Sequence, residues 1–128
     1  MKLAMHSERF KAQDRLRTQA DFDRVYQRRC SASDGLLLVF ICRNELAQAR
    51  LGLSVSRKVG GAVVRNRWKR LIREAFRLSR AQLPSGIDII AIPRQGAEPA
   101  LEPLQASLAR LAARALKKID HVKEPPSP

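Results

Sequence analysis

Residues 57–77 read RKVGGAVVRNRWKRLIREAFR, a glycine pair followed by a long run without further glycine or proline. On a helical wheel of about 100° per residue, this run separates into two faces. One face is apolar and consists of Val64, Trp68, Leu71, Ile72, Ala75 and Phe76. The opposite face is polar and consists of Asn66, Lys69, Arg70, Arg73, Arg77 and Arg80. The stretch therefore predicts a helix over residues 62–81 with a core side and a cationic side.

The cationic side of this helix has almost no acidic partner in the sequence. Residues 57–80 hold nine basic residues and one acid, Glu74, so they carry +8 of the formal net charge of +13. Like charges four residues apart on a helix repel each other by roughly a few tenths of a kcal/mol per pair. A bound polyanion would remove this repulsion, whereas a merely solvated face usually mixes both signs. The pattern favours phosphate binding over a solvated face.

Three features of the stretch allow two interpretations each. Trp68 could stack on a base, but its place on the apolar side favours core packing. Asn66 interrupts the basic row, either as an incidental polar residue or as a hydrogen-bonding partner for a sugar or base edge. The glycine pair after Arg57 and Lys58 could form a phosphate-binding nest at the start of the helix, or only a tight turn.

Two strands are predicted before this helix and one after it. Residues 36–43 are apolar on both alternating sets, which is typical of a central strand covered on both sides, or of a strand with one apolar face kept for a ligand. Residues 50–55 alternate apolar and polar side chains, so we expect a half-buried strand that forms a hairpin with residues 36–43. Residues 87–92 form the third expected strand, and a weak further strand is allowed at residues 30–33.

Two more helices flank these elements. The pair of Thr18 and Asp21 is a variant of the capping box, which marks the start of a helix. We expect this helix to end near residue 28. Residues 103–119 carry an apolar stripe and form the last expected helix. The order of helices and strands predicts an α+β fold, a sandwich with a small mixed sheet.

Length and composition fit one domain with loose ends. The chain has 128 residues, of which 45% are hydrophobic, enough for one core. We expect residues 1–14 to be a flexible N-terminal segment, residues 15–119 to be the folded domain, and residues 120–128 to be a disordered tail.

Several classes of protein are not supported by the sequence. The longest apolar run, residues 36–42, is far shorter than the ~18 residues of a membrane span, and the charged first residues do not resemble a signal peptide. Cys30 and Cys42 lack metal-site spacing and are expected to be reduced cysteines of a cytoplasmic protein. No catalytic triad or HExxH motif occurs. Asp88 and Glu74 are isolated in the sequence and could at most help to hold one magnesium ion.

The stretch around Arg65-Asn66-Arg67 resembles the signature of the protein subunit of bacterial ribonuclease P. Arg15-Leu16 and the segments 21–26, 50–56 and 88–94 agree with that family in order and spacing. The resemblance implies a sheet flanked by helices, with a left-handed β-α-β crossover. It also implies a complex with a catalytic RNA that removes the 5′ leader from precursor tRNA, in which the RNA and its Mg²⁺ ions perform the hydrolysis.

The resemblance assigns binding roles to two groups of residues. On the side of the catalytic RNA lie Arg57, Lys58, Arg65, Asn66, Arg67, Lys69, Arg70, Arg73 and Arg77. The cleft for the single-stranded leader contains Arg15, Phe22, Tyr26 and Phe40. From the residues alone, the three aromatic side chains fit a core better than a stacking surface, and the resemblance reverses that preference. It implies no catalytic residue, no assigned metal position, no membrane and no protein partner.

Three other functions remain as alternatives. A ribosomal or DNA-binding protein could place the basic helix in a groove, and a preference for duplex DNA over structured RNA would indicate it. A helix that binds a membrane surface would bind liposomes, although the strands argue against it. A stand-alone nuclease would cleave without added RNA.

Overall fold

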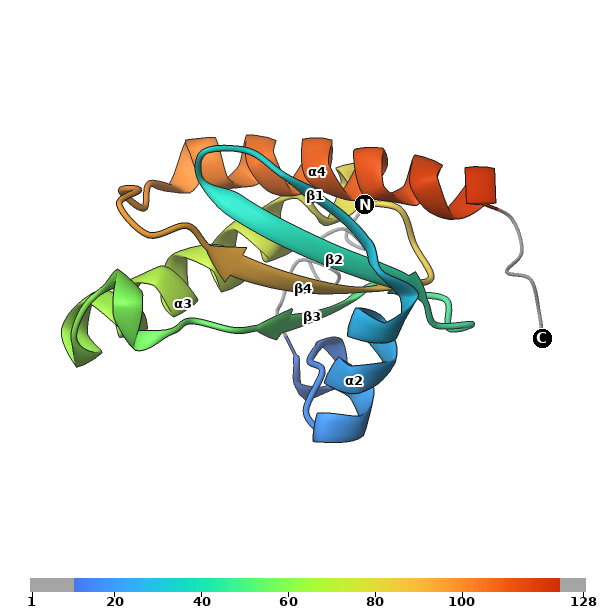
Figure 1. The fold of residues 1–128 in the computed structure, drawn as a ribbon, viewed down its shortest axis with the longest axis horizontal. Helices are drawn as coiled ribbons and strands as arrows, with labels where there is room; N and C mark the ends of the chain where they lie inside the picture. The colour runs from blue at the N-terminus through green and yellow to red at the C-terminus, as the bar shows by residue number, and fades with distance from the viewer. Residues whose placement is uncertain (1–10, 123–128) are drawn as a thin grey trace, which may run out of the picture.

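The structure is a computed structural model that describes residues 11–122, and Figure 1 shows a mixed sheet flanked by helices. The sheet has four strands in the order β1-β2-β4-β3. Their bounds are β1 Cys30–Ser33, β2 Leu37–Arg43, β3 Arg50–Leu53 and β4 Ile87–Pro93. The predicted single-domain α+β fold with a small mixed sheet is confirmed, and so is the weak strand that the sequence allowed before β2.

The predicted hairpin between β2 and β3 is wrong. β4 lies between these two strands: β2 pairs with it antiparallel, and β3 pairs with it parallel, with Leu51 opposite Ile89. The physical reason is burial, because β2 and β4 are both apolar on two faces and therefore take the central places in the sheet. β3 lies outside β4, and the connection between these parallel neighbours runs through the basic helix.

Three α-helices cover the sheet: α2 (Gln19–Arg28), α3 (Ala62–Leu78) and α4 (Leu101–Val122). α3 and α4 pack on one face over the larger core, and α2 packs on the other face over a smaller cluster (Figure 1). β2 is therefore covered on both sides, as expected of a central strand. Within residues 11–122, no helix is long and apolar enough to span a membrane.

The helix ends follow the sequence with small differences. Thr18 caps α2, because its hydroxyl oxygen accepts a hydrogen bond from the Asp21 N–H at 3.1 Å. α3 ends at Leu78, and a short 3-10 helix, η3 (Arg80–Gln82), continues the chain. α4 begins two residues earlier than predicted and extends to Val122, so the start of the expected tail is helical. The rest of that tail, residues 123–128, lies outside the described residues.

The folded domain also begins earlier than predicted. Residues 12–14 form a 3-10 helix, η1 (Ala12–Asp14), in which Asp14 is buried. Leu16 is buried as well, and its N–H donates to the Leu51 carbonyl of β3 at 2.9 Å. These two anchors place residues 11–14 in the domain and correct the expectation of a flexible segment there, while residues 1–10 lie outside the described part of the chain.

Candidate functional site

The outer face of α3 carries the charge that the helical wheel predicted. Trp68, Ile72 and Phe76 are almost fully buried, so the core role of Trp68 is confirmed. Asn66, Arg67 and Arg70 are exposed on the other side. Val64 departs from the prediction, because it is 41% exposed in the first turn of the helix. Its side chain lies against Gly60, where an added Cβ would meet the Val64 Cβ at 2.8 Å.

This close contact and a φ of 146° account for the glycine at position 60. The tight turn is therefore confirmed, and the phosphate-nest interpretation stays a prediction. Arg57 and Lys58 precede the turn in a 3-10 helix, η2 (Arg57–Val59), with exposed side chains. The Ser56 hydroxyl oxygen accepts the Lys58 N–H at 3.0 Å and caps this short helix.

Most cations of α3 have no acidic partner in the part of the chain that the structure describes. Arg77 forms an ion pair with Glu74, and the Arg65 Nε donates to the Gly60 carbonyl at 3.2 Å. Within residues 11–122, no carboxylate pairs with the remaining cations of the helix, which are Arg67, Lys69, Arg70 and Arg73. Their mutual repulsion is not compensated inside the described part of the protein.

A hollow of about 430 Å³ lies between the N-terminal segment, α2, β3 and α3. Its apolar wall consists of Leu16, Phe22, Leu51 and Leu53, and its basic wall consists of Arg15, Arg17, Lys69 and Arg73. Among residues 11–122, no acidic side chain lines it. We call this hollow the basic groove. It brings Arg15 and Phe22, predicted to hold the leader, together with Lys69 and Arg73, predicted to face the catalytic RNA.

The electrostatics of the basic groove favour an anion. Burial lowers the pKa of Arg73, and the positive charge of Arg15 lowers this pKa further. Two guanidinium groups thus repel each other where water is partly excluded. An anion placed between them would be stabilised by both.

The three predicted aromatic residues form a row that begins at the basic groove. The ring centroids of Phe22 and Tyr26 lie 6.5 Å apart, and those of Tyr26 and Phe40 lie 5.0 Å apart in an edge-to-face arrangement. All three rings are half-buried against the smaller core cluster. Only Phe22 lines the groove. The structure therefore places two of the four predicted leader-binding residues, Arg15 and Phe22, in the basic groove. The other two, Tyr26 and Phe40, extend the row of rings away from it.

Asp88 has a structural role that the sequence did not reveal. Its buried carboxylate accepts two hydrogen bonds from Arg50, at 2.9 and 2.8 Å, one from Asn44 at 2.8 Å, and one from Arg24. Both carboxylate oxygens are thus engaged by cations or amides. The expectation that Asp88 and Glu74 are isolated is therefore wrong, because Glu74 is also paired with an arginine. A magnesium role for either carboxylate stays a prediction. The hydrogen bonds to Asp88 raise the pKa of Arg50.

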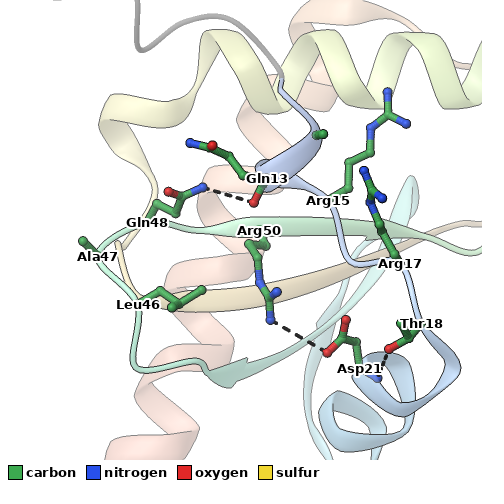
Figure 2. A pocket seen from close by; sticks show the side chains of 10 residues that line it. Gln13, Arg15, Arg17, Thr18, Asp21, Leu46, Ala47, Gln48 and Arg50 are labelled. Carbon is green, nitrogen blue, oxygen red and sulfur yellow. Dashed lines mark hydrogen bonds and ion pairs between the residues drawn. The ribbon is translucent and has the colours of Figure 1, made fainter.

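A second hollow, of about 670 Å³, lies on the other side of the N-terminal segment (Figure 2). Arg15 and Arg17 line both hollows and form the ridge between them. In Figure 2 the side chains of Arg15 and Arg17 point the same way, whereas Arg50 points in the opposite direction, toward Asp21. The Arg50 Nη2 lies 4.0 Å from the Asp21 Oδ1. Sequence reasoning missed Arg17. The signal was the alternation of Arg15 and Arg17 about the buried Leu16, which is typical of an extended segment.

Fold and site together define a class: a small, basic α+β protein whose cationic helix and neighbouring groove form one surface suited to a polyanion. The family model of ribonuclease P matches residues 10–119. The chain belongs to the ribonuclease P protein family. It is thus a protein component of the ribonucleoprotein that processes tRNA.

Individual relatives agree with this assignment. The ribonuclease P protein component of Brevibacillus brevis is 42% identical over 103 residues, which cover 79% of this chain and 82% of the relative. That of Lachnoclostridium phytofermentans is 43% identical over 83 residues, 65% of this chain and 72% of the relative. The RNase P protein structure from Staphylococcus aureus has a TM-score of 0.68 at 38% identity, covering 89% of this chain and 100% of that one. The Thermotoga maritima structure has a TM-score of 0.60 at 30% identity, with coverages of 86% and 98%.

Proposed function

We propose that this chain is the accessory subunit of ribonuclease P, which binds the catalytic RNA through the outer face of α3 and the 5′ leader of precursor tRNA in the basic groove. The RNA and its Mg²⁺ ions perform the hydrolysis, and the protein supplies no catalytic residue. One observation carries the proposal: Lys69 and Arg73 belong both to the cationic face of α3 and to the lining of the groove. A single cationic surface can therefore serve two RNA segments that meet there.

The physical role of the protein is to reduce phosphate repulsion. Leader, tRNA and catalytic RNA bring their backbones together at the cleavage site, and protein cations replace part of the Mg²⁺ that would otherwise screen them. Contacts to the leader exist only in the precursor, so they favour precursor over mature tRNA. Backbone contacts and stacking on rings such as Phe22 tolerate any base. This mode of binding broadens the range of leaders that the complex accepts.

The proposed contacts follow the two predicted groups. The catalytic RNA contacts Arg57, Lys58, Arg65, Asn66, Arg67, Lys69, Arg70, Arg73 and Arg77. The leader passes Arg15 and Phe22 in the basic groove and continues along the rings of Tyr26 and Phe40.

Reconstituted cleavage of a precursor tRNA at low Mg²⁺ tests the proposal. We expect leader removal only when a bacterial catalytic RNA and this protein are both present, with no cleavage by the protein alone. The double variant Lys69→Ala/Arg73→Ala should lose most of the stimulation. The matched control, Arg114→Ala/Lys117→Ala, removes the same charge from the exposed face of α4 and should cleave normally. Stimulation that is absent, or equal in both variants, would contradict the proposal.

A further inference from the structure

We propose that Asp14 is a positioning residue: it fixes Arg15 across the basic groove from Arg73, so that the two guanidinium groups clamp one phosphate of the RNA strand. The inference rests on the proposed function, because the strand in the groove is taken to be the leader. It names a specific phosphate subsite and the residue that builds it.

Asp14 has the contacts of an anchor. Its carboxylate is buried, and it accepts hydrogen bonds from Arg80 Nη2 at 3.0 Å and from Arg80 Nη1 at 3.3 Å. The Gln48 Nε2 donates to it at 2.8 Å, and the Lys11 N–H donates at 2.7 Å. A buried carboxylate is stable only when it is paired in this way. Three separate segments therefore meet at one side chain.

The anchor controls the next residue in the chain. Arg15 forms a parallel bridge with Leu51 on β3, and the Leu16 N–H donates to the Leu51 carbonyl at 2.9 Å. The backbone of Arg15 is thus held by Asp14 on one side and by Leu16 on the other. Its side chain is exposed and lines the basic groove.

The ion pair joins the same two parts of the molecule that carry the two arginines. Asp14 and Arg15 belong to the N-terminal segment, whereas Arg73 lies on α3 and Arg80 follows the end of that helix. Repulsion between Arg15 and Arg73 would push the segment away from α3, and the attraction between Asp14 and Arg80 opposes it. The spacing of the clamp therefore depends on Asp14. Two guanidinium groups at a fixed spacing match the oxygens of one phosphate.

The test is the affinity of the reconstituted complex for precursor tRNA relative to mature tRNA. Asp14→Asn keeps the shape of the side chain and removes its charge. We expect this variant to lower the precursor-to-mature affinity ratio by about tenfold, as Arg15→Ala should. Both variants should also flatten the salt dependence of precursor binding by roughly 0.7 in slope, the contribution of one single-strand phosphate contact. The double variant should be no worse than Arg15→Ala alone.

Asp34→Asn is the matched control, because Asp34 also joins two elements through an arginine, Arg110, but lies away from the groove. Its affinity ratio should be unchanged, and an equal loss in both variants would overturn the inference. If Asp14→Asn does not fold, Arg80→Gln removes the other partner and must lower the same ratio. If folded Asp14→Asn, or Arg80→Gln in its place, has a normal precursor-to-mature affinity ratio while Arg15→Ala lowers it, only the role of Asp14 is overturned. A normal ratio in Arg15→Ala and Arg73→Ala overturns the proposed groove and the clamp together.

Discussion

Gly52 is the residue on which the shape of the basic groove depends. A Cβ at this position of β3 would lie 2.8 Å from the Phe22 Cζ and 3.0 Å from the Leu16 Cδ1. The glycine therefore lets both side chains rest directly on the sheet. Its conformation is ordinary for a strand, so its value here lies in the missing side chain.

We predict that Gly52→Ala will displace the Phe22 ring into the groove. The overpacking should lower the free energy of unfolding by about 1–3 kcal/mol and reduce the preference for precursor over mature tRNA severalfold. Urea unfolding and tRNA affinity measure the two effects. Gly35→Ala is the control, because an added Cβ there meets nothing within 4 Å. A Gly52→Ala protein with unchanged stability and preference would show that the ring does not need this space.

A second prediction concerns Arg70, which is exposed on α3 and has no carboxylate partner within the described residues. Arg70→Ala should leave the stability unchanged. It should reduce the salt dependence of assembly with the catalytic RNA by roughly 0.7 to 0.9 in slope, the effect of one lost phosphate contact. Binding titrations at several salt concentrations measure the slope, and Arg114→Ala serves as the control. A slope equal to that of the unchanged protein would remove Arg70 from the interface.

Single residues were predictable where their role depends on local spacing. The cationic face of α3 follows from the 3.6-residue period, and the cap at Thr18 follows from the residue three positions later. The side chains of Asp14, Gln48 and Asp88 contact other side chains that are 34 or more positions away in the sequence. No local pattern contains those contacts. The anchoring role of Asp14 and the arginine contacts of Asp88 are therefore seen only in the structure.

At the scale of elements, α3 serves the core and the interface at once. Trp68 is 1% exposed and packs in the larger core, while Arg67 on the neighbouring position faces outward. Any movement of the buried side therefore displaces the cationic side.

We predict that Trp68→Ala will lower the free energy of unfolding by about 3–5 kcal/mol, the cost of a cavity left by a large aromatic side chain. Trp68→Phe should lose less, because it retains most of the buried area. Chemical denaturation of the free protein measures both. A Trp68→Ala protein of normal stability with weakened RNA binding would instead indicate that the indole stacks on a base.

The arrangement of strands was only partly predictable. The two-sided apolar pattern of residues 36–43 correctly identified β2 as a buried strand, and the alternation of β3 correctly indicated partial burial. β4 was predicted as a strand, but its burial on both faces is seen only in the structure. The predicted pairing of β2 with β3 was wrong. Strands that are neighbours in sequence usually pair as a hairpin, whereas here the more apolar β4 lies between them. The hydrophobic pattern of one strand indicates how buried it is, but does not determine which strands lie beside it in the sheet.

At the scale of the whole molecule, carboxylates that bind arginine make stability depend on pH. Burial opposes the charge of Asp34, but hydrogen bonds from Ser107, from the Leu37 and Leu36 N–H groups and from Arg110 hold its pKa well below the ordinary value of 3.8. Arg24 lowers the pKa of Asp21, and Arg77 lowers that of Glu74. Each group is more acidic in the folded state than in the unfolded chain.

The sign of the effect follows from these directions. The contribution to stability is fully present above the unfolded pKa values near 4 and is lost as the pH falls below them. We predict that the free energy of unfolding is constant from pH 7 to about pH 5 and then declines toward pH 2. Asp34→Asn should have a shallower decline. Urea unfolding at pH 6, 4 and 2.5 measures it, and a stability that rises on acidification would contradict the assignment.

The overall architecture and the family were readable from the sequence because the signature helix is local and unusually charged. The start of the domain was not predictable, because Asp14 and Leu16 are held by Arg80 and Leu51, which are far away in the chain. The groove itself is a property of the assembled molecule. It lies among four segments, and no one of them would reveal it alone.

The most direct test of the central claim is to find where the leader lies in the reconstituted complex. A precursor tRNA with photoreactive 4-thiouridine at single leader positions can be crosslinked to the protein, and the attached peptide can be mapped by mass spectrometry. We predict crosslinks to the N-terminal segment and start of α2 around Arg15 and Phe22, and to α3 around Lys69 and Arg73. Crosslinks confined to α4, or found only on the catalytic RNA, would contradict the account.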